Sequence, residues 1–198
     1  VDIHTATASK VFKTPVEDIT REQRSQAKAV NFGIIYGQSA FGLAQNLNIS
    51  RKEAKGIIDS YFEEYPTIKK YMENVVSAAR EQGYVKTVLD RRRYLPDINS
   101  TNAIVRGYAE RNAINAPIQG SAADVIKLAM VAVQKEMFAR ELNSKMILQV
   151  HDELVFDVHT DEKGILEKIV KESMEGALKL SVPLEVEYKI AGNWLDAH

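Results

Sequence analysis

Two cations and two aromatic rings recur at four-residue intervals near the start of the chain. They are Arg24, Lys28, Phe32 and Tyr36. Because four residues advance a helix by only about 40° around its axis, the four side chains would share one stripe. Arginine binds phosphate through paired N–H groups, lysine is a point charge that can give up a proton, and a ring can stack on any nucleobase. The stripe therefore suits a triphosphate followed by a base.

An ordinary amphipathic helix is the alternative for this stripe, with the rings in the core and the cations reaching solvent from its edge. Gly33 and Gly37, which directly follow the two rings, favour ligand binding. Each glycine costs a helix about 1 kcal/mol relative to alanine, which predicts that something approaches the backbone closely at these positions.

A second candidate site lies in the segment QVHDELVF, residues 149–156. His151, Asp152 and Glu153 separate two hydrophobic, β-rich runs, although Asn-Gly would be the favoured turn sequence. Adjacent carboxylates on a rigid turn suit Mg²⁺, which takes oxygen ligands. The alternatives are a polar hairpin tip that only serves solubility, and a metal-dependent nuclease or phosphatase that activates water.

A third group consists of hydrogen-bond donors at four-residue spacing in RNAINAPIQG, residues 111–120. These donors are Arg111, Asn115 and Gln119, on a helix that Pro117 is expected to interrupt. The minor groove of DNA offers acceptors at nearly the same place in every base pair. Donors placed there would sense base-pair geometry without reading sequence. A polar helix face is the alternative.

Local start and stop signals predict the helices that position these residues. Thr20 with Gln23 and Ser50 with Glu53 form capping boxes, and a proline at 66 opens a helix that ends before a glycine at 83. The predicted helices of the first part are 21–37, 51–63, 66–82 and 102–114, with a short hairpin at 84–96.

The last third of the chain changes to the periodicity of strands. A long, largely buried helix is predicted at 120–141, followed by a tight hairpin of strands 146–150 and 154–158. A helix at 161–180 and a third strand at 183–190 complete the prediction. Helices followed by a small antiparallel sheet make an α+β fold.

The composition fits a folded, soluble chain with one continuous structural unit: 198 residues, 45% hydrophobic and 27% charged. No run approaches the roughly 18–20 consecutive apolar residues of a membrane span, and the absence of cysteine fits a reducing cytoplasm. Residues 152–198 hold 11 acidic and 5 basic side chains, which leaves 16 acidic and 21 basic in residues 1–151. The positive first part permits a nucleic-acid partner, and solvated surface charge is the alternative.

With these groups in this order, the chain resembles the C-terminal part of the polymerase domain of the family A DNA polymerases, the bacterial DNA polymerase I type. The resemblance covers nearly the whole chain, through the family's fingers-helix and palm-hairpin motifs. It implies that His4, Arg24 and Lys28 contact the phosphates of the incoming nucleotide, with Lys28 also the general acid for the pyrophosphate leaving group. Phe32 would stack on the base and sugar, and Tyr36 would lie next to the template base.

The resemblance also implies a right-hand polymerase fold, present in part. Residues 1–115 would form mainly helical fingers with the inserted hairpin, and residues 116–198 a partial palm with a small antiparallel sheet. Asp152 would bind catalytic Mg²⁺, with Glu153 assisting. The residues expected to contact primer-template DNA are Arg111, Asn115, Gln119 and His151.

Two departures from the family pattern matter. Asp90 precedes three arginines where relatives commonly have glycine, but aspartate tolerates a left-handed turn, so we expect the hairpin to survive. The family's Asp-Tyr-Ser motif, with the second metal-binding aspartate, is absent, and the chain contains no Asp-Tyr pair. Since two-metal phosphoryl transfer needs carboxylates for both ions, we expect a fragment that is inactive without the upstream palm and thumb.

The implied parent function is template-directed DNA synthesis in replication and repair, with nucleotidyl transfer from a deoxynucleoside triphosphate to a primer 3′-hydroxyl and two Mg²⁺ ions. The implied partners are primer-template DNA, the triphosphates and the remainder of the polymerase domain, with no membrane. The expected location is the bacterial cytoplasm, at the nucleoid. A non-catalytic module that binds primer-template and a metal-dependent nuclease remain as alternatives.

Overall fold

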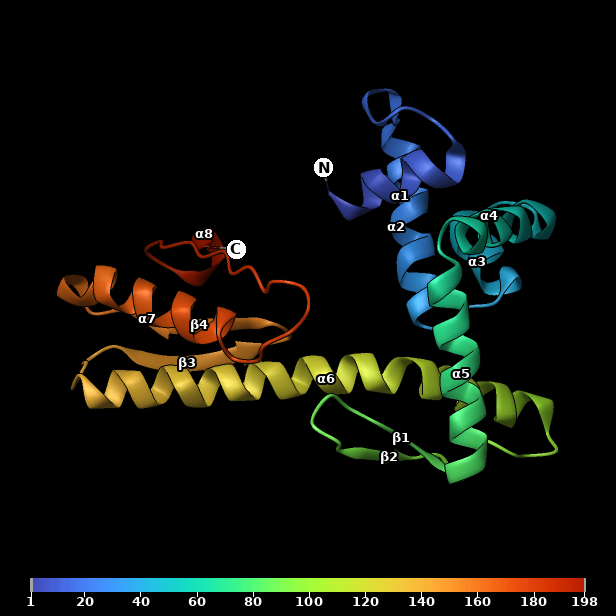
Figure 1. The fold of residues 1–198 in the computed structure, drawn as a ribbon. Helices are drawn as coiled ribbons and strands as arrows, with labels where there is room; N and C mark the ends of the chain where they lie inside the picture. Colours follow the sequence, from blue (N-terminus) through green and yellow to red (C-terminus); the bar gives the residue numbers. More distant parts are fainter. Residues whose placement is uncertain (1, 198) are drawn as a thin grey trace. The chain divides into compact units, whose positions relative to one another are not determined.

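The computed structural model describes residues 2–197 and shows a mainly helical chain with two small antiparallel sheets (Figure 1). These residues form two compact units that divide between Gln119 and Gly120. The α+β prediction is confirmed. Unit 1 contains helices α1 (Ile3–Phe12), α2 (Arg21–Ile35), α3 (Ala40–Leu47), α4 (Arg51–Glu64) and α5 (Pro66–Gln82), and strands β1 (Tyr84–Lys86) and β2 (Arg92–Tyr94).

Capping boxes start α2 and α4 of unit 1 where the sequence predicts. The Thr20 side chain accepts a hydrogen bond from the Gln23 N–H at 3.1 Å, and the Thr20 N–H donates to Gln23 Oε1 at 3.0 Å. Ser50 and Glu53 form the second capping box, at the start of α4. Helices α1 and α3 were not predicted, because each is short and only one side-chain cap marks its beginning.

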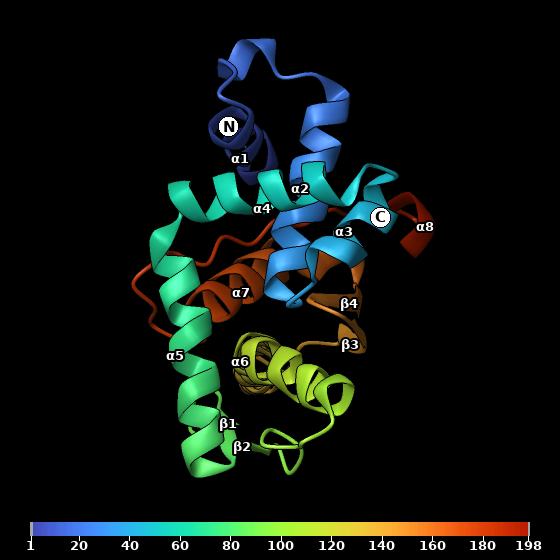
Figure 2. The same cartoon turned by 90° about the vertical axis from the view of Figure 1, so that its right-hand side faces the viewer.

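The core of unit 1 joins four helices. Val11 of α1, Val30 and Ile34 of α2, Leu43 of α3 and Tyr61 of α4 are buried in one apolar cluster. Helix α1 packs against α2 and α4, and α3 lies beside α4 (Figure 2). This packing fixes one side of α2 and leaves its other side available for the stripe of cations and rings.

The predicted hairpin after α5 is confirmed. Tyr84 faces Tyr94 across β1 and β2, with ring centroids 5.8 Å apart. Asp90 adopts the left-handed conformation that its position requires, with φ = 60°. Val85 is buried beside residues of α5 and of the following long helix, so the hairpin is anchored to the helical part of the unit.

Helix α6 (Ala103–Ala139) runs through both units without a break, about 55 Å for its 37 residues. The predicted interruption at Pro117 is therefore wrong. Proline removes one backbone hydrogen bond at a cost of about 3 kcal/mol, but helix α6 is packed on both sides of it, with Ala113 completely buried within unit 1 and Val133 within unit 2. By length and composition alone α6 could cross a membrane, a test that core helices of soluble proteins also pass.

Burial of α6 within unit 2 is confined to one stripe, so the prediction of a largely buried helix is also wrong. Val133 and Met137 pack into the core, whereas Val131 and Phe138 are 68% and 82% exposed. Apolar composition predicted burial all around the helix, but unit 2 supplies packing partners for only one side of it.

Unit 2 places a hairpin of β3 (Lys145–Val150) and β4 (Glu153–Asp157) beside helices α6 and α7 (Lys163–Glu175). Helix α7 is shorter than the predicted 161–180, because a 3-10 turn precedes it and a weak helix former, Gly176, stands at its end. The short helix α8 (Trp194–Ala197) closes the described chain.

The third strand predicted at 183–190 does not form among the described residues. The segment has no regular secondary structure, and its Val186 N–H donates to the carboxylate of Glu175 on α7, at 3.2 Å. Alternation of apolar residues predicts a strand only where another strand is available to pair with it.

Candidate functional site

Three of the four stripe residues of helix α2, Lys28, Phe32 and Tyr36, line a cavity of about 560 Å³ in unit 1, and Arg24 lies outside it. Phe32 and Tyr36 are 46% and 47% exposed, so the alternative in which both rings fill the core is wrong. Arg111 of α6 lines the same cavity. The lining residues are Ser25, Lys28, Ala29, Phe32, Gly33, Tyr36, Gln38, Asn46 and Arg111.

The end of α2 approaches α6 closely, and Gly37 makes this approach possible. Gly37 has φ = 64°, and a Cβ atom there would lie 2.8 Å from Cγ and 3.3 Å from Cα of Arg111. The adjacent Tyr36 hydroxyl accepts a hydrogen bond from Gln119 Nε2 at 3.4 Å. At Gly33 a Cβ would lie 2.5 Å from Gln38 Oε1. A close approach to both glycines is therefore present, but Arg111 and Gln38 of the chain make it, and not a ligand.

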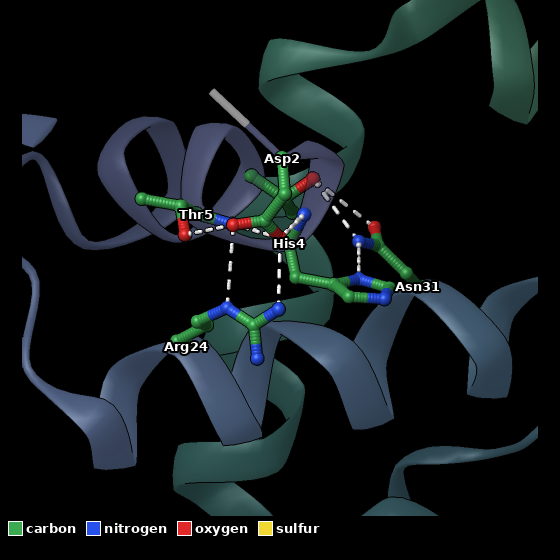
Figure 3. Close-up of polar contacts among 6 residues, drawn as sticks. Asp2, His4, Thr5, Arg24 and Asn31 are labelled. Atoms are coloured by element: carbon green, nitrogen blue, oxygen red, sulfur yellow. Dashed lines mark hydrogen bonds and ion pairs between the residues drawn. The ribbon is translucent and has the colours of Figure 1, made fainter. Parts of the chain in front are cut away.

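Two further predicted residues, His4 and Arg24, meet where the start of α1 lies against α2 (Figure 3). Asp2 caps α1 and accepts from the backbone N–H of His4 at 3.0 Å. Arg24 donates to both oxygens of the Asp2 carboxylate, from Nε at 3.3 Å and from Nη2 at 3.2 Å. The Thr5 hydroxyl and then the Arg24 guanidinium hold the pKa of Asp2 well below its usual range.

Asn31 connects the His4 imidazole to α2. Its Nδ2 atom lies 3.1 Å from His4 Nδ1, and its amide also bonds with the hydroxyl of Thr7 at 3.2 Å. The His4 ring centroid is 5.8 Å from that of Phe32. Sequence reasoning missed Asp2 and Asn31. An aspartate one residue before a helix is a recognisable capping signal, but the contact of Asn31 with a residue 27 positions away has no local signal.

The three predicted minor-groove donors differ in their surroundings. Arg111 and Gln119 are exposed, and the Arg111 guanidinium lies 5.8 Å from the centroid of the Tyr108 ring. Asn115 is half-buried, and its Oδ1 atom is buried without a hydrogen-bond partner among the described residues. A buried amide oxygen without a hydrogen bond destabilises the fold. The Asn115 oxygen can therefore accept a hydrogen bond from a donor outside the described residues.

In unit 2, the hairpin tip is tighter than predicted. Only His151 and Asp152 separate the strands, because Glu153 already pairs with Val150 as the first residue of β4. His151 has φ = 53°, and its carbonyl accepts from Gln149 Nε2 at 2.6 Å. All three residues of the predicted His-Asp-Glu group are exposed. Asp152 therefore lies exposed at the tip of the turn, and the hydrogen bond from Gln149 of β3 to the His151 carbonyl stabilises the backbone there.

The donors at this tip suit a hard divalent cation in chemistry but make only part of a ligand set. Asp152 and Glu153 supply carboxylate oxygens, the ligands that Mg²⁺ prefers. Within residues 2–197, no group of three or more histidine, aspartate or glutamate side chains is placed to hold a metal ion. A complete site would require ligands in addition to these two.

Comparison with known proteins gives one consistent result. The family model described as DNA polymerase family A matches residues 1–196. The DNA polymerase I of Caldicellulosiruptor bescii is 55% identical over 196 residues, which are 99% of this chain and 23% of that protein. That of Geobacillus stearothermophilus is 52% identical over 197 residues, 100% of this chain and 22% of that protein.

A solved structure agrees with the sequence relatives. The POL domain of Pol1 from M. smegmatis, in complex with DNA primer-template and dNTP, superimposes with a TM-score of 0.90 at 49% identity. The match covers 93% of this chain and 32% of that one. The chain therefore spans less than a quarter of the length of these sequence relatives and about a third of the structural one.

Proposed function

The chain belongs to DNA polymerase family A, and on that basis we propose that it carries the nucleotide-binding surface of a template-directed DNA polymerase. The reaction joins a deoxynucleoside triphosphate to a primer 3′-hydroxyl and releases pyrophosphate. The observation that carries this proposal is the cavity in which Lys28, Phe32 and Tyr36 of α2 face Arg111 of α6. A cation beside two exposed rings can bind phosphate and base together.

In this proposal the incoming nucleotide lies along α2. His4, Arg24 and Lys28 donate to the phosphate oxygens, and Lys28 also transfers a proton to the pyrophosphate as it leaves. Phe32 stacks on the base and sugar, while Tyr36 lies next to the template base. Arg24 now donates to the Asp2 carboxylate from Nε and Nη2, so a phosphate either replaces Asp2 at these atoms or binds the remaining N–H donors.

Primer-template DNA is the proposed second partner. Gln119 already contacts Tyr36, and Arg111 lines the same cavity, so donors from α6 reach the place where the nascent base pair would form. Asn115 and, on the hairpin of unit 2, His151 are the other proposed DNA contacts. Donors that meet minor-groove acceptors accept all four correct pairs and disfavour misshapen ones.

Asp152 and Glu153 are the residues that would hold Mg²⁺. When bound, the cation would neutralise charge on the reacting phosphate oxygens. Because the described residues offer no third ligand near this pair, we propose the remainder of the polymerase domain as the third partner and as the source of the other carboxylate. We also propose a location in the bacterial cytoplasm, at the nucleoid, since the chain is similar to DNA polymerases I of bacteria.

Binding of a fluorescent deoxynucleoside triphosphate to the 198-residue chain tests the nucleotide site. We expect Arg24→Ala and Lys28→Ala each to weaken binding by roughly 10- to 100-fold, the equivalent of one lost charge-assisted hydrogen bond. Lys55→Ala is the matched control, because Lys55 pairs with Asp59 on α4, away from the stripe. Equal losses in all three variants would contradict a site on α2.

Primer extension with Mg²⁺ tests the reaction and the missing ligand together. We expect no extension by this chain alone, and extension when the upstream palm and thumb of a family A polymerase are added as a separate chain. Asp152→Ala should abolish the restored activity. Release of nucleotides from DNA by the chain alone, with Mg²⁺ and no triphosphate, would instead support the nuclease alternative.

A further inference from the structure

We propose that Asn31 is a positioning residue that sets the His4 imidazole with its Nε2–H directed to the nucleotide phosphates. This inference rests on the proposed function, because it assigns His4 to phosphate. Asn31 itself would not touch the nucleotide. It would act through the hydrogen bond between its amide nitrogen and His4 Nδ1, which measures 3.1 Å.

The burial of Asn31 is the first reason. Asn31 lies inside α2 and is only 8% exposed, one of few buried polar side chains among the described residues. Asparagine is a poor helix former, and an amide buried without partners is destabilising. Here the amide is used by two side chains of α1, His4 and Thr7. Between α1 and α2, these hydrogen bonds therefore stand where an apolar residue would make packing contacts.

The chemistry of the ring is the second reason. A neutral imidazole has one nitrogen that donates and one that accepts. With the amide oriented as in the structure, its nitrogen faces His4 Nδ1 and can only donate, which assigns the acceptor role to Nδ1 and the proton to Nε2. No described residue forms a hydrogen bond with Nε2. The ring is thus fixed in the tautomer that donates from its unoccupied nitrogen, which is what a phosphate oxygen needs.

The remaining contacts of His4 limit the orientation of the ring. Its backbone N–H is held by Asp2, and its ring stands 5.8 Å from the Phe32 ring at 43°. The Thr7 hydroxyl, which can donate and accept, bonds with the amide of Asn31 and steadies it. Arg24 is held by the same Asp2 carboxylate. Two of the proposed phosphate donors are therefore placed before any nucleotide binds.

Nitrogen-15 NMR of the histidine side chains in the 198-residue chain tests the inference without a ligand. At about pH 8.5, above the ordinary titration range of histidine, two-bond correlations distinguish Nε2–H from Nδ1–H rings, and a His4→Gln variant assigns the His4 signals. We expect the Nε2–H tautomer to predominate at His4. A predominant Nδ1–H tautomer in the unmodified chain would overturn the inference, whether or not any variant folds.

Two variants of Asn31 change the tautomer in known directions. Asn31→Leu should lower the ratio of Nε2–H to Nδ1–H about fivefold, the equilibrium weight of one hydrogen bond. Asn31→Asp, whose carboxylate only accepts, should move the proton to Nδ1. Gln26→Leu makes the same amide-to-leucine change elsewhere on α2 and should leave His4 unchanged. An unaltered ratio in both Asn31 variants would contradict the inference.

Titration with inorganic tripolyphosphate separates this inference from the proposed function. We expect the polyphosphate to move the Nε2 signal of His4 and to bind Asn31→Leu up to about fivefold more weakly than Gln26→Leu. If the tautomer is as expected but tripolyphosphate leaves the His4 signals unmoved, Asn31 still positions the ring and the phosphate-binding role of His4 is overturned.

Discussion

The guanidinium of Arg24 already donates to a carboxylate, since Asp2 accepts from its Nε and Nη2 atoms. A phosphate that binds the Nε–Nη2 edge of the guanidinium must compete with Asp2 for these donors, and the Asp2 charge also opposes an anion at the remaining ones. Asp2→Asn keeps a side-chain oxygen to cap α1 and removes the competing charge. We expect it to tighten binding of tripolyphosphate by no more than about fivefold, because an exposed ion pair is weak. Weaker binding would show instead that Asp2 holds Arg24 ready for phosphate.

Glu162 provides a pH-dependent contact in unit 2. The Ser144 hydroxyl, followed by the Asn143 N–H, lowers the pKa of Glu162 from 4.5 to about 2. A carboxyl whose pKa is depressed by folding stabilises the fold fully above the unfolded value, and this contribution is lost as the pH falls towards 2. We expect Glu162→Gln to lower the melting temperature at pH 6 and to make progressively less difference between pH 5 and 2. Circular dichroism measures both.

A matched replacement supplies the control for Glu162. Glu167→Gln makes the same chemical change on α7, outside the group of contacts at residues 143 and 144. Its effect on the melting temperature should not change in the same way with pH. A Glu162→Gln effect that stayed constant from pH 6 to pH 2 would contradict the assigned role of the carboxylate.

At the residue scale, the sequence was informative where spacing alone places side chains together. Arg24, Lys28, Phe32 and Tyr36 could be assigned to one stripe because a helix has a fixed period. Asn31 lies on the same helix, but its role depends on α1 packing against α2, and no period in the sequence encodes that packing.

Among the elements, helix α2 depends on the capping box at its start. Thr20→Ala removes the side-chain oxygen that accepts from the Gln23 N–H, and we expect it to lower the free energy of unfolding by about 1 kcal/mol. Urea denaturation measures this difference. Thr20→Ser keeps a hydroxyl at the same place and should recover most of the stability. Equal losses from both replacements would mean that the methyl group, not the hydroxyl, matters.

The close approach of α2 to α6 can be tested with two glycines that should respond in opposite directions. Gly37 has φ = 64° and Arg111 in the way of a Cβ atom, so we expect Gly37→Ala to destabilise the chain by about 1 to 2 kcal/mol. Gly56 lies inside α4 with nothing within 4 Å of a Cβ, and Gly56→Ala should stabilise it by up to about 1 kcal/mol.

Nucleotide binding distinguishes these two glycine variants further. Because Gly37 adjoins Tyr36 and Arg111 at the cavity, its replacement should also weaken binding of the fluorescent triphosphate. Gly56→Ala should leave binding unchanged. If Gly37→Ala were as stable as the unmodified chain, the contact between the end of α2 and α6 would not be as close as the structure shows.

Element boundaries were predictable where the signal was local and wrong where packing decided. Capping boxes located the starts of α2 and α4, and Asp90 marked the turn between β1 and β2. Pro117 did not stop α6, which has buried residues on both sides of the proline in spite of the lost hydrogen bond. The alternating segment 183–190 found no strand to pair with. Both errors concern partners that lie far away in the sequence.

On the scale of the whole molecule, exposed apolar surface is the most prominent feature of unit 2. Val131 and Phe138 on α6 and Ile147 on β3 are large, apolar and exposed. The sheet of β3 and β4 has two strands, so each strand also has an unpaired edge. Exposed apolar side chains and open sheet edges both favour association with another chain.

We therefore expect the 198-residue chain to self-associate as its concentration rises. A double replacement, Val131→Lys with Phe138→Lys, should shift the association to higher concentration in light scattering, because it replaces two exposed apolar side chains of α6 with charges. Ile104→Lys is the control, since Ile104 is 83% exposed at the other end of α6, in unit 1. If Ile104→Lys suppressed association equally, net charge and not the surface of unit 2 would be responsible. A chain that stayed monomeric at every concentration would contradict the expectation outright.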